Sequence, residues 1–112
     1  MKAASAGPDS GRRIVIVDMD GTLADVRHRL HFVRGMKKNW KQFFRRMDQD
    51  PPNYGVVDWV RELAHDYSIV VVTGRPEEYR DRTVAWLDRH KVPHDAIHMR
   101  KDGDRRPDYV IK

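Results

Sequence analysis

Two aspartates follow a short, strongly apolar run near the start of the chain. Asp18 and Asp20 are separated by one residue and come directly after four β-branched residues, Ile14–Val17. A run this short and apolar is typical of a strand buried on both faces of a parallel sheet. Carboxylates at the end of such a strand are costly unless a cation or a reaction uses them. The pair therefore indicates a site for metal binding or catalysis.

A calcium-binding loop of the EF-hand type is excluded. Such a loop needs oxygen ligands at positions 1, 3 and 5, Gly at 6 and Glu at 12. Counted from Asp18, the residues at positions 5, 6 and 12 are Thr22, Leu23 and Arg29. The remaining alternative is a turn that only happens to hold two aspartates, and the apolar run before it argues against this.

The run Asp18–Leu23 resembles the first motif of the haloacid dehalogenase (HAD) superfamily of phosphatases and phosphotransferases. The resemblance implies that Asp18 attacks phosphorus and becomes an aspartyl-phosphate, while Asp20 serves as general acid and base. It also implies Mg²⁺ as cofactor, with Asp18 and the main-chain carbonyl of Asp20 as metal ligands. The residue types suit this role, because a carboxylate can attack a metal-polarised phosphoryl group and a neighbouring acid can carry the proton.

A second polar segment, Thr73-Gly74-Arg75, resembles the second HAD motif, whose hydroxyl binds a phosphate oxygen. A small hydroxyl, a glycine amide and a nearby helix N-terminus together form an anion site. Taken alone, the segment followed by proline is an ordinary turn. Taken with the first motif, Thr73, Gly74 and Arg75 are predicted to bind phosphate.

The segment Met99–Lys112 is similar to the run that carries the third motif in polynucleotide kinase-phosphatases and their phage relatives. This similarity implies that Lys112 is the catalytic lysine that neutralises charge on the aspartate and the phosphate. It also implies substrate contacts from Arg100 and Arg106, for which solvated loop charges remain an equal alternative.

The same resemblance places the fourth motif, an acidic pair that completes the Mg²⁺ site, beyond Lys112. We therefore expect C-terminal strands to be missing and the domain of residues 13–112 to be incomplete at its C-terminus. The absent strand would lie beside residues 13–18, so we expect that strand to form an open edge through which the chain self-associates. Residues 1–12, rich in Ala, Ser and Gly, predict a disordered tail.

The elements that position these residues follow from apolar periodicity. Residues 13–18 and 68–72 predict two strands of similar pattern, and residues 56–66 predict a helix between them. Two such strands joined through a helix form a βαβ unit with parallel strands. Residues 95–99 predict a weaker third strand. The expected fold class is α/β, a Rossmann-like parallel sheet flanked by helices.

Residues 27–54 are expected to form a small helical cap insertion. Residues 27–46 contain eight Lys or Arg and no Asp or Glu. The apolar residues at helical spacing are Trp40, Phe43, Phe44 and Met47. A solvated basic face over a packed apolar face explains this stripe fully. Because HAD enzymes carry a cap at this place, the resemblance adds that Lys38 and Lys41 contact a phosphorylated substrate.

Composition limits the choice of partners. The 112-residue chain supports one small domain, and its 22 Lys and Arg against 17 Asp and Glu give a formal net charge of +5. This balance favours anionic partners. The chain has no cysteine, which excludes disulfides and suits a reducing, cytoplasmic compartment. No apolar run approaches the length of a membrane span, so no membrane partner is expected.

Together with these observations, the resemblance implies a Mg²⁺-dependent phosphomonoesterase that acts through an aspartyl-phosphate on 3′-phosphate ends of nucleic acid. Two alternatives stay open. One is a phosphatase of nucleotides or small molecules, and the other is a catalytically incomplete module that binds phosphate or nucleic acid. The intact Asp18 favours an enzyme, whereas the missing fourth motif favours a binding module.

Overall fold

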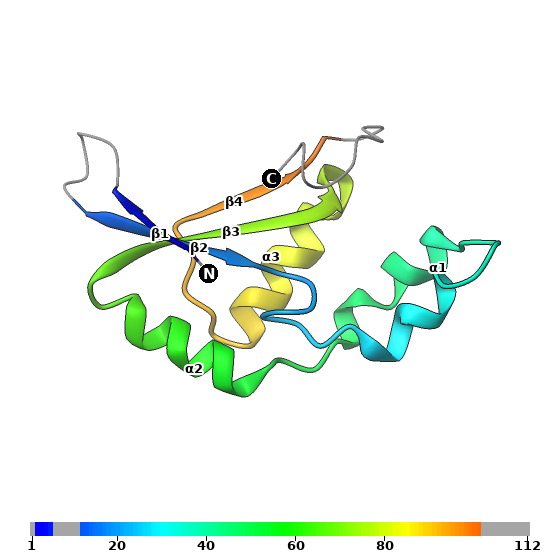
Figure 1. The fold of residues 1–112 in the computed structure, drawn as a ribbon, viewed down its shortest axis with the longest axis horizontal. Coiled ribbons are helices and arrows are strands. Elements are labelled where there is room, and N and C mark those ends of the chain that lie inside the picture. The colour runs from blue at the N-terminus through cyan, green and yellow to red at the C-terminus, as the bar shows by residue number, and fades with distance from the viewer. Residues whose placement is uncertain (1, 6–11, 102–112) are drawn as a thin grey trace.

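A four-stranded sheet forms the centre of the molecule (Figure 1). The computed structural model describes residues 2–5 and 12–101. The strands are β1 (Lys2–Ser5), β2 (Arg13–Asp18), β3 (Tyr67–Pro76) and β4 (Ala96–Arg100), in the spatial order β1-β2-β3-β4. β2, β3 and β4 are parallel, and β1 is antiparallel to β2. The expected α/β class with a parallel sheet is confirmed.

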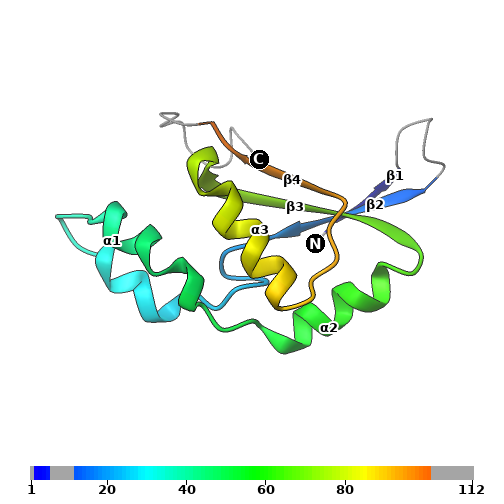
Figure 2. The same cartoon turned by 180° about the vertical axis from the view of Figure 1, so that it is seen from behind.

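Two helices cover one face of this sheet. α2 (Tyr54–Leu63) precedes β3, and α3 (Arg80–Arg89) connects β3 to β4; both lie on the same side of the sheet in opposite views (Figures 1 and 2). The two crossovers explain why β2, β3 and β4 are parallel. Within the described residues, no helix is long and apolar enough to cross a lipid bilayer.

The segment after Val72 differs from expectation. β3 continues through Thr73 to Pro76, and α3 begins only at Arg80, after the 3₁₀ turn η3 (Glu77–Tyr79). Pro76 pairs with Arg100 of β4 and is extended, with ψ 150°. This pairing holds the polar segment within the sheet, so the expected helix N-terminus does not begin directly after Thr73-Gly74-Arg75.

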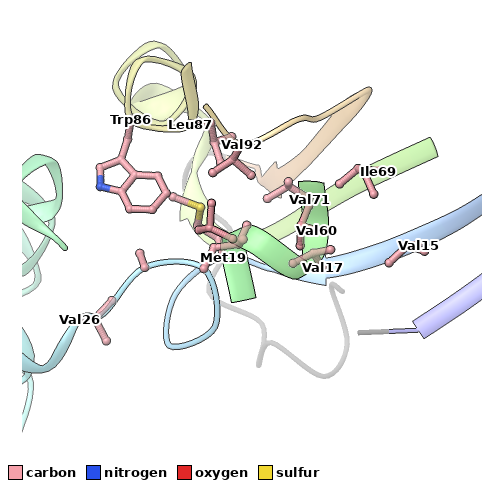
Figure 3. Packing of buried hydrophobic residues seen from close by; sticks show 13 residues of the cluster. Val15, Val17, Met19, Val26, Val60, Ile69, Val71, Trp86, Leu87 and Val92 are labelled. Atoms are coloured by element: carbon pink, nitrogen blue, oxygen red, sulfur yellow. The ribbon is translucent and has the colours of Figure 1, made fainter. Parts of the chain in front are cut away.

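The hydrophobic core lies between the sheet and the two helices (Figure 3). It includes Val15, Val17, Ile69 and Val71 from the strands and Val57, Val60, Trp86 and Leu87 from the helices. Burying each such side chain contributes roughly 1.5–3 kcal/mol. This packing fixes the carboxyl ends of β2 and β3 against one another.

The opposite face of the sheet is only half-buried, which corrects the expectation that β2 is buried on both faces. Burial alternates along β2 and β3 because successive side chains point to opposite faces. The side chains on this second face include Ile14, Ile16, Val70 and Val72, and with His98, Met99 and Thr73 they line a hollow of about 310 Å³. Both helices that pack on the described sheet belong to the other face.

The predicted tail contains a strand, and the predicted open edge is covered. β1 pairs with β2 from Lys2 opposite Ile16 to Ser5 opposite Arg13. The unpaired backbone groups of an edge strand are a template for another strand, and here the N-terminal segment of the same chain takes that place. Over Lys2–Ser5 the structure therefore has a strand in place of the expected tail, and this strand covers the edge of β2 that was expected to be open; self-association of the chain stays a prediction.

The expected cap is an insertion of short helices between β2 and α2. It contains η1 (Arg27–Phe32), α1 (Trp40–Arg45) and η2 (Met47–Gln49). Asn39 caps α1, with its side-chain oxygen accepting from the backbone N–H of Gln42. The insertion lies beyond the carboxyl ends of β2 and β3 (Figure 1), where the predicted site residues are placed.

Candidate active site

A tight turn holds the two aspartates of the first motif at the end of β2. Asp18 is the last residue of β2 and pairs with Val72 of β3. The carbonyl of Met19 accepts hydrogen bonds from the backbone N–H groups of residues 22 to 24, at 2.9–3.3 Å. Met19 and Leu23 are fully buried. The turn is therefore anchored in the core, and it places Asp18 and Asp20 at the carboxyl end of β2.

Gly21 is required by the shape of this turn. Its φ is +82°, a conformation that residues with a Cβ rarely adopt. Its N–H donates to the carbonyl of Ala24 at 2.9 Å. The glycine of the motif thus lets the chain reverse direction immediately after Asp20.

The Asp20 carboxylate is held by two arginines and a threonine. Arg75 donates from Nε at 3.1 and 3.2 Å and from Nη2 at 2.8 Å, Arg29 donates from Nη2 at 3.0 Å, and the Thr73 hydroxyl donates at 3.3 Å. Burial by itself would raise the pKa of Asp20, but the charges of Arg75 and Arg29 and these hydrogen bonds hold it below its ordinary value. Asp20 is therefore an ionised, firmly oriented carboxylate.

A second, fully buried carboxylate lies behind Asp20. Asp50 accepts from Arg29 Nε and Nη2, each at 2.7 Å, and from Arg75 Nη2 at 3.4 Å. The ring nitrogen Nε2 of His28 lies 2.6 Å from its Oδ1. The side chains of Asp50, Arg29 and Arg75 are all fully buried. Two carboxylates and two guanidinium groups thus form one buried ionic network.

Residues of the second motif join this network, and Thr73 also lines the hollow on the second face of the sheet. The Arg75 guanidinium is fully buried and also donates to the Thr83 hydroxyl at 3.1 Å. The Thr73 hydroxyl accepts from the backbone N–H of Arg75 at 3.1 Å while donating to Asp20. In this structure the Arg75 side chain therefore orients Asp20, and phosphate binding by this segment remains a prediction.

Of the other predicted site residues, only some lie in the part of the chain that the structure describes. Arg100 reaches the end of β3, with Nε donating to the carbonyl of Gly74 at 3.2 Å. Lys38 and Lys41 are exposed on the cap. Arg106 and Lys112 lie outside the described residues.

The oxygen donors of the first motif suit Mg²⁺ in part. In the part of the chain that the structure describes, no three His, Cys, Asp or Glu side chains gather as ligands of one metal ion. Mg²⁺ retains several waters and binds through one or two carboxylates. Because the Asp20 side chain is engaged by arginines, the protein donors that fit are the Asp18 carboxylate and the main-chain carbonyl of Asp20.

Asp50, Arg29 and His28 were not predicted from the sequence as site residues. In the sequence, Arg29 is one of eight basic residues of the cap, and Asp50 lies near the end of the same insertion. One signal was available: residues 27–46 contain no acid, so any buried arginine in this segment needs a carboxylate from outside it. The nearest acids that follow are Asp48 and Asp50.

Comparisons with known proteins agree with this geometry. Residues 12–112 match the sequence model of the family described as "Polynucleotide kinase PNKP phosphatase domain". One similar solved structure, "Structure of the Pnkp1/Rnl/Hen1 RNA repair complex", has a TM-score of 0.72 and 26% identity over 95% of this chain and 32% of that chain. Another, "Structure of Pnkp1/Rnl/Hen1 complex", has a TM-score of 0.71 and 25% identity over all of this chain and 36% of that one.

Curated relatives share a shorter segment. Membrane-associated phosphatidylinositol transfer protein 1 of Rattus norvegicus is 45% identical over 53 residues, and protein 2 of Mus musculus is 43% identical over 53 residues. Each match covers 46% of this chain and 4% of the relative. The chain thus spans about a third of the similar solved chains and a small part of these relatives. The family match covers residues 12–112, and the parallel sheet carries the paired aspartates at the end of β2. This chain therefore belongs to the polynucleotide kinase PNKP phosphatase domain family of the HAD superfamily.

Proposed function

We propose that this domain hydrolyses phosphomonoesters through an aspartyl-phosphate on Asp18, with Mg²⁺ as cofactor and 3′-phosphate ends of nucleic acid as substrates. The observation that carries the proposal is the arrangement of Asp18 and Asp20 at the end of β2, with Asp20 oriented by Arg75, Arg29 and Thr73. A residue that only closes a turn does not need three side-chain donors.

The proposed reaction has two displacements. The Asp18 carboxylate attacks phosphorus, the bond to the ester oxygen breaks, and Asp20 gives its proton to that oxygen. Asp20 then takes a proton from a water that attacks the phosphorus of the aspartyl-phosphate, which releases inorganic phosphate and restores Asp18. When bound by Asp18 and the Asp20 carbonyl, Mg²⁺ would reduce the negative charge of the phosphoryl group.

Asp20 must be protonated for the first displacement, although its pKa is lowered in this structure. A phosphate group beside Asp20 adds negative charge, which raises the pKa of a neighbouring carboxyl. The phosphate also competes for the charges of Arg29 and Arg75. Substrate binding is therefore expected to move Asp20 toward the protonated form that donates to the leaving oxygen.

The remaining predicted residues have supporting roles in this proposal. The Thr73-Gly74 segment binds phosphate oxygens through its hydroxyl and amide, and Lys112 neutralises charge on Asp18 and the phosphoryl group. Arg100 is supported by its contact with Gly74. Together with Arg106, Lys38 and Lys41, it is proposed to contact substrate.

A nucleic-acid substrate is supported by charge and by the named relatives. The net charge of +5 and the acid-free segment of residues 27–46 favour a polyanion, and one similar solved structure is an RNA repair complex. The alternative of a phosphate-binding module without turnover is favoured by a separate observation: among the described residues, no three His, Cys, Asp or Glu side chains are placed to hold one metal ion.

Phosphate release from a 3′-phosphorylated oligonucleotide at millimolar Mg²⁺ tests the proposal. The Asp18→Asn variant should form neither product nor acid-stable phosphoprotein, because an amide is a poor nucleophile. The Asp20→Asn variant should still form phosphoprotein from an activated aryl phosphate, which needs little leaving-group protonation. Equal turnover by the wild type and Asp18→Asn would refute the mechanism, and binding without turnover by the wild type would favour the binding module.

A further inference from the structure

Three aromatic rings form a continuous row between the cap and the end of β3. The rings of Trp40 and Phe44, both on α1, have centroids 6.0 Å apart and planes 25° apart. The rings of Phe44 and Tyr79 are 5.1 Å and 28° apart. Tyr79 belongs to η3, directly after β3. The three ring planes are close to parallel, so the faces of the rings share one orientation. We call the rings of Trp40, Phe44 and Tyr79 the aromatic row.

Two side chains, Phe43 and Arg29, connect the aromatic row to the Asp20 carboxylate. Phe43 packs edge-on against both rings of α1, with centroids 5.5 Å from Trp40 and 5.3 Å from Phe44. On its other side, the Phe43 ring lies 4.2 Å from the guanidinium carbon of Arg29, which donates to Asp20. A strand whose terminal phosphate is bound at Asp18 can therefore continue toward this row.

Core packing explains only part of the row. Phe43 is buried and connects the cap to Arg29, whereas Trp40 is 51% exposed. Large aromatic side chains bury most of their surface when their role is packing. The exposed half of Trp40 is thus available to a ligand that stacks.

The surroundings of the row are basic. The exposed basic side chains of the cap near α1 are Lys37, Lys38, Lys41 and Arg45. The guanidinium carbon of Arg82 lies 5.9 Å from the centre of the Tyr79 ring. Arg82 Nε also donates to Asp48 at 2.9 Å, which balances the negative charge of that carboxylate. Stacked aromatic rings beside positive charge are the two components of sites that bind single-stranded nucleic acid.

We propose that the aromatic row is a stacking site for the bases of a single-stranded nucleic acid, and that the basic side chains around it bind the phosphates between those bases. The proposal deepens the proposed function, because it gives the phosphatase site a preference for strand ends over free nucleotides. A membrane surface or an acidic peptide would use the charges but not the parallel rings.

Matched tryptophan variants test the row. Trp59 is 57% exposed and belongs to α2, a helix that lies away from α1 (Figure 1), so Trp59→Ala is the control for Trp40→Ala. The ligands are a labelled single strand without a terminal phosphate and an abasic strand of equal length, both titrated without Mg²⁺. Trp40→Ala should weaken binding of the first strand about tenfold, with no change for the abasic strand or for Trp59→Ala. Trp40→Phe should retain most of the affinity.

Equal affinities of the wild type and Trp40→Ala for the first strand would overturn the proposal, and so would an equal loss on the abasic strand. Should Trp40→Ala fail to fold, the Trp59→Phe protein supplies a second readout, because Trp86 is fully buried and Trp40 then dominates the solvent-sensitive emission. Saturation with the first strand should quench this emission, and unchanged emission would also overturn the proposal. Since no step requires hydrolysis, these results are independent of whether the domain is a phosphatase.

Discussion

Neutralising the buried Asp50 should destabilise the domain more than any other single carboxylate change near the site. The Asp50→Asn variant keeps the shape of the side chain but removes its charge. Arg29 and Arg75 are fully buried, so neither guanidinium can turn to solvent for compensation. In Asp50→Asn, only the Asp20 carboxylate would then be left to balance the charges of these two guanidinium groups.

The expected size of the effect follows from burial. Removing one partner of a buried ion pair costs about 3–5 kcal/mol, against a total stability of about 5–15 kcal/mol for a small domain. About 1 kcal/mol lowers the melting temperature by about 4–8 °C at this chain length. We therefore expect the melting temperature of Asp50→Asn to fall by at least about 12 °C.

Asp48→Asn is the matched control, because Asp48 lies on η2, which ends directly before Asp50. Its side chain is 42% exposed and pairs with the partly exposed Arg82 at 2.9 Å, an interaction worth about 0–1 kcal/mol. Thermal unfolding followed by circular dichroism measures both variants. If Asp50→Asn melts within about 4 °C of Asp48→Asn, the buried network does not stabilise the domain as described.

Two further predictions concern pH and salt. The pKa of Asp20 is lower in the folded state than in the unfolded chain, so the stabilising contribution of its charge is present above about pH 4 and is lost as the pH falls through the folded-state pKa. In urea unfolding from pH 5 to pH 2, the free energy of unfolding should therefore fall less for Asp20→Asn than for the wild type. Equal decreases for the two proteins would contradict this linkage. If Lys38 and Lys41 each contact one phosphate, Lys38→Gln and Lys41→Gln should each reduce the slope of log binding constant against log salt concentration for a single strand by about 0.7. Lys91→Gln, on the loop after α3, is the control and should leave this slope unchanged.

Local patterns were sufficient to predict the part of the fold that carries the aspartates. The β-branched runs before Asp18 and before Thr73 can be buried only in a sheet, and the helix between them makes the two strands parallel. The turn after Asp18 was also predictable, because its hydrogen bonds join residues only a few positions apart, from Met19 to Ala24.

The buried network was not predictable, because its partners come from distant segments. Arg29 and Asp50 are 21 residues apart, and Arg75 is 25 residues beyond Asp50. In the sequence, Arg29 is one of eight cap residues with the same charge, and nothing local separates the buried one from the solvated ones. β1 was missed for a related reason: Ala and Ser favour strands weakly, and the template for β1 is the edge of β2.

The direction of β1 matters for how the protein is engineered. Its antiparallel pairing carries the chain from Ser5 opposite Arg13 to Lys2 opposite Ile16, so the start of the chain points toward the carboxyl end of β2. At about 3.3 Å per residue, Ile16 is only about 7 Å along the strand from Asp18. An affinity tag or a partner domain fused ahead of β1 would thus be directed toward Asp18 and Asp20, where, under the proposed function, it would compete with substrate for access or could be used to deliver it.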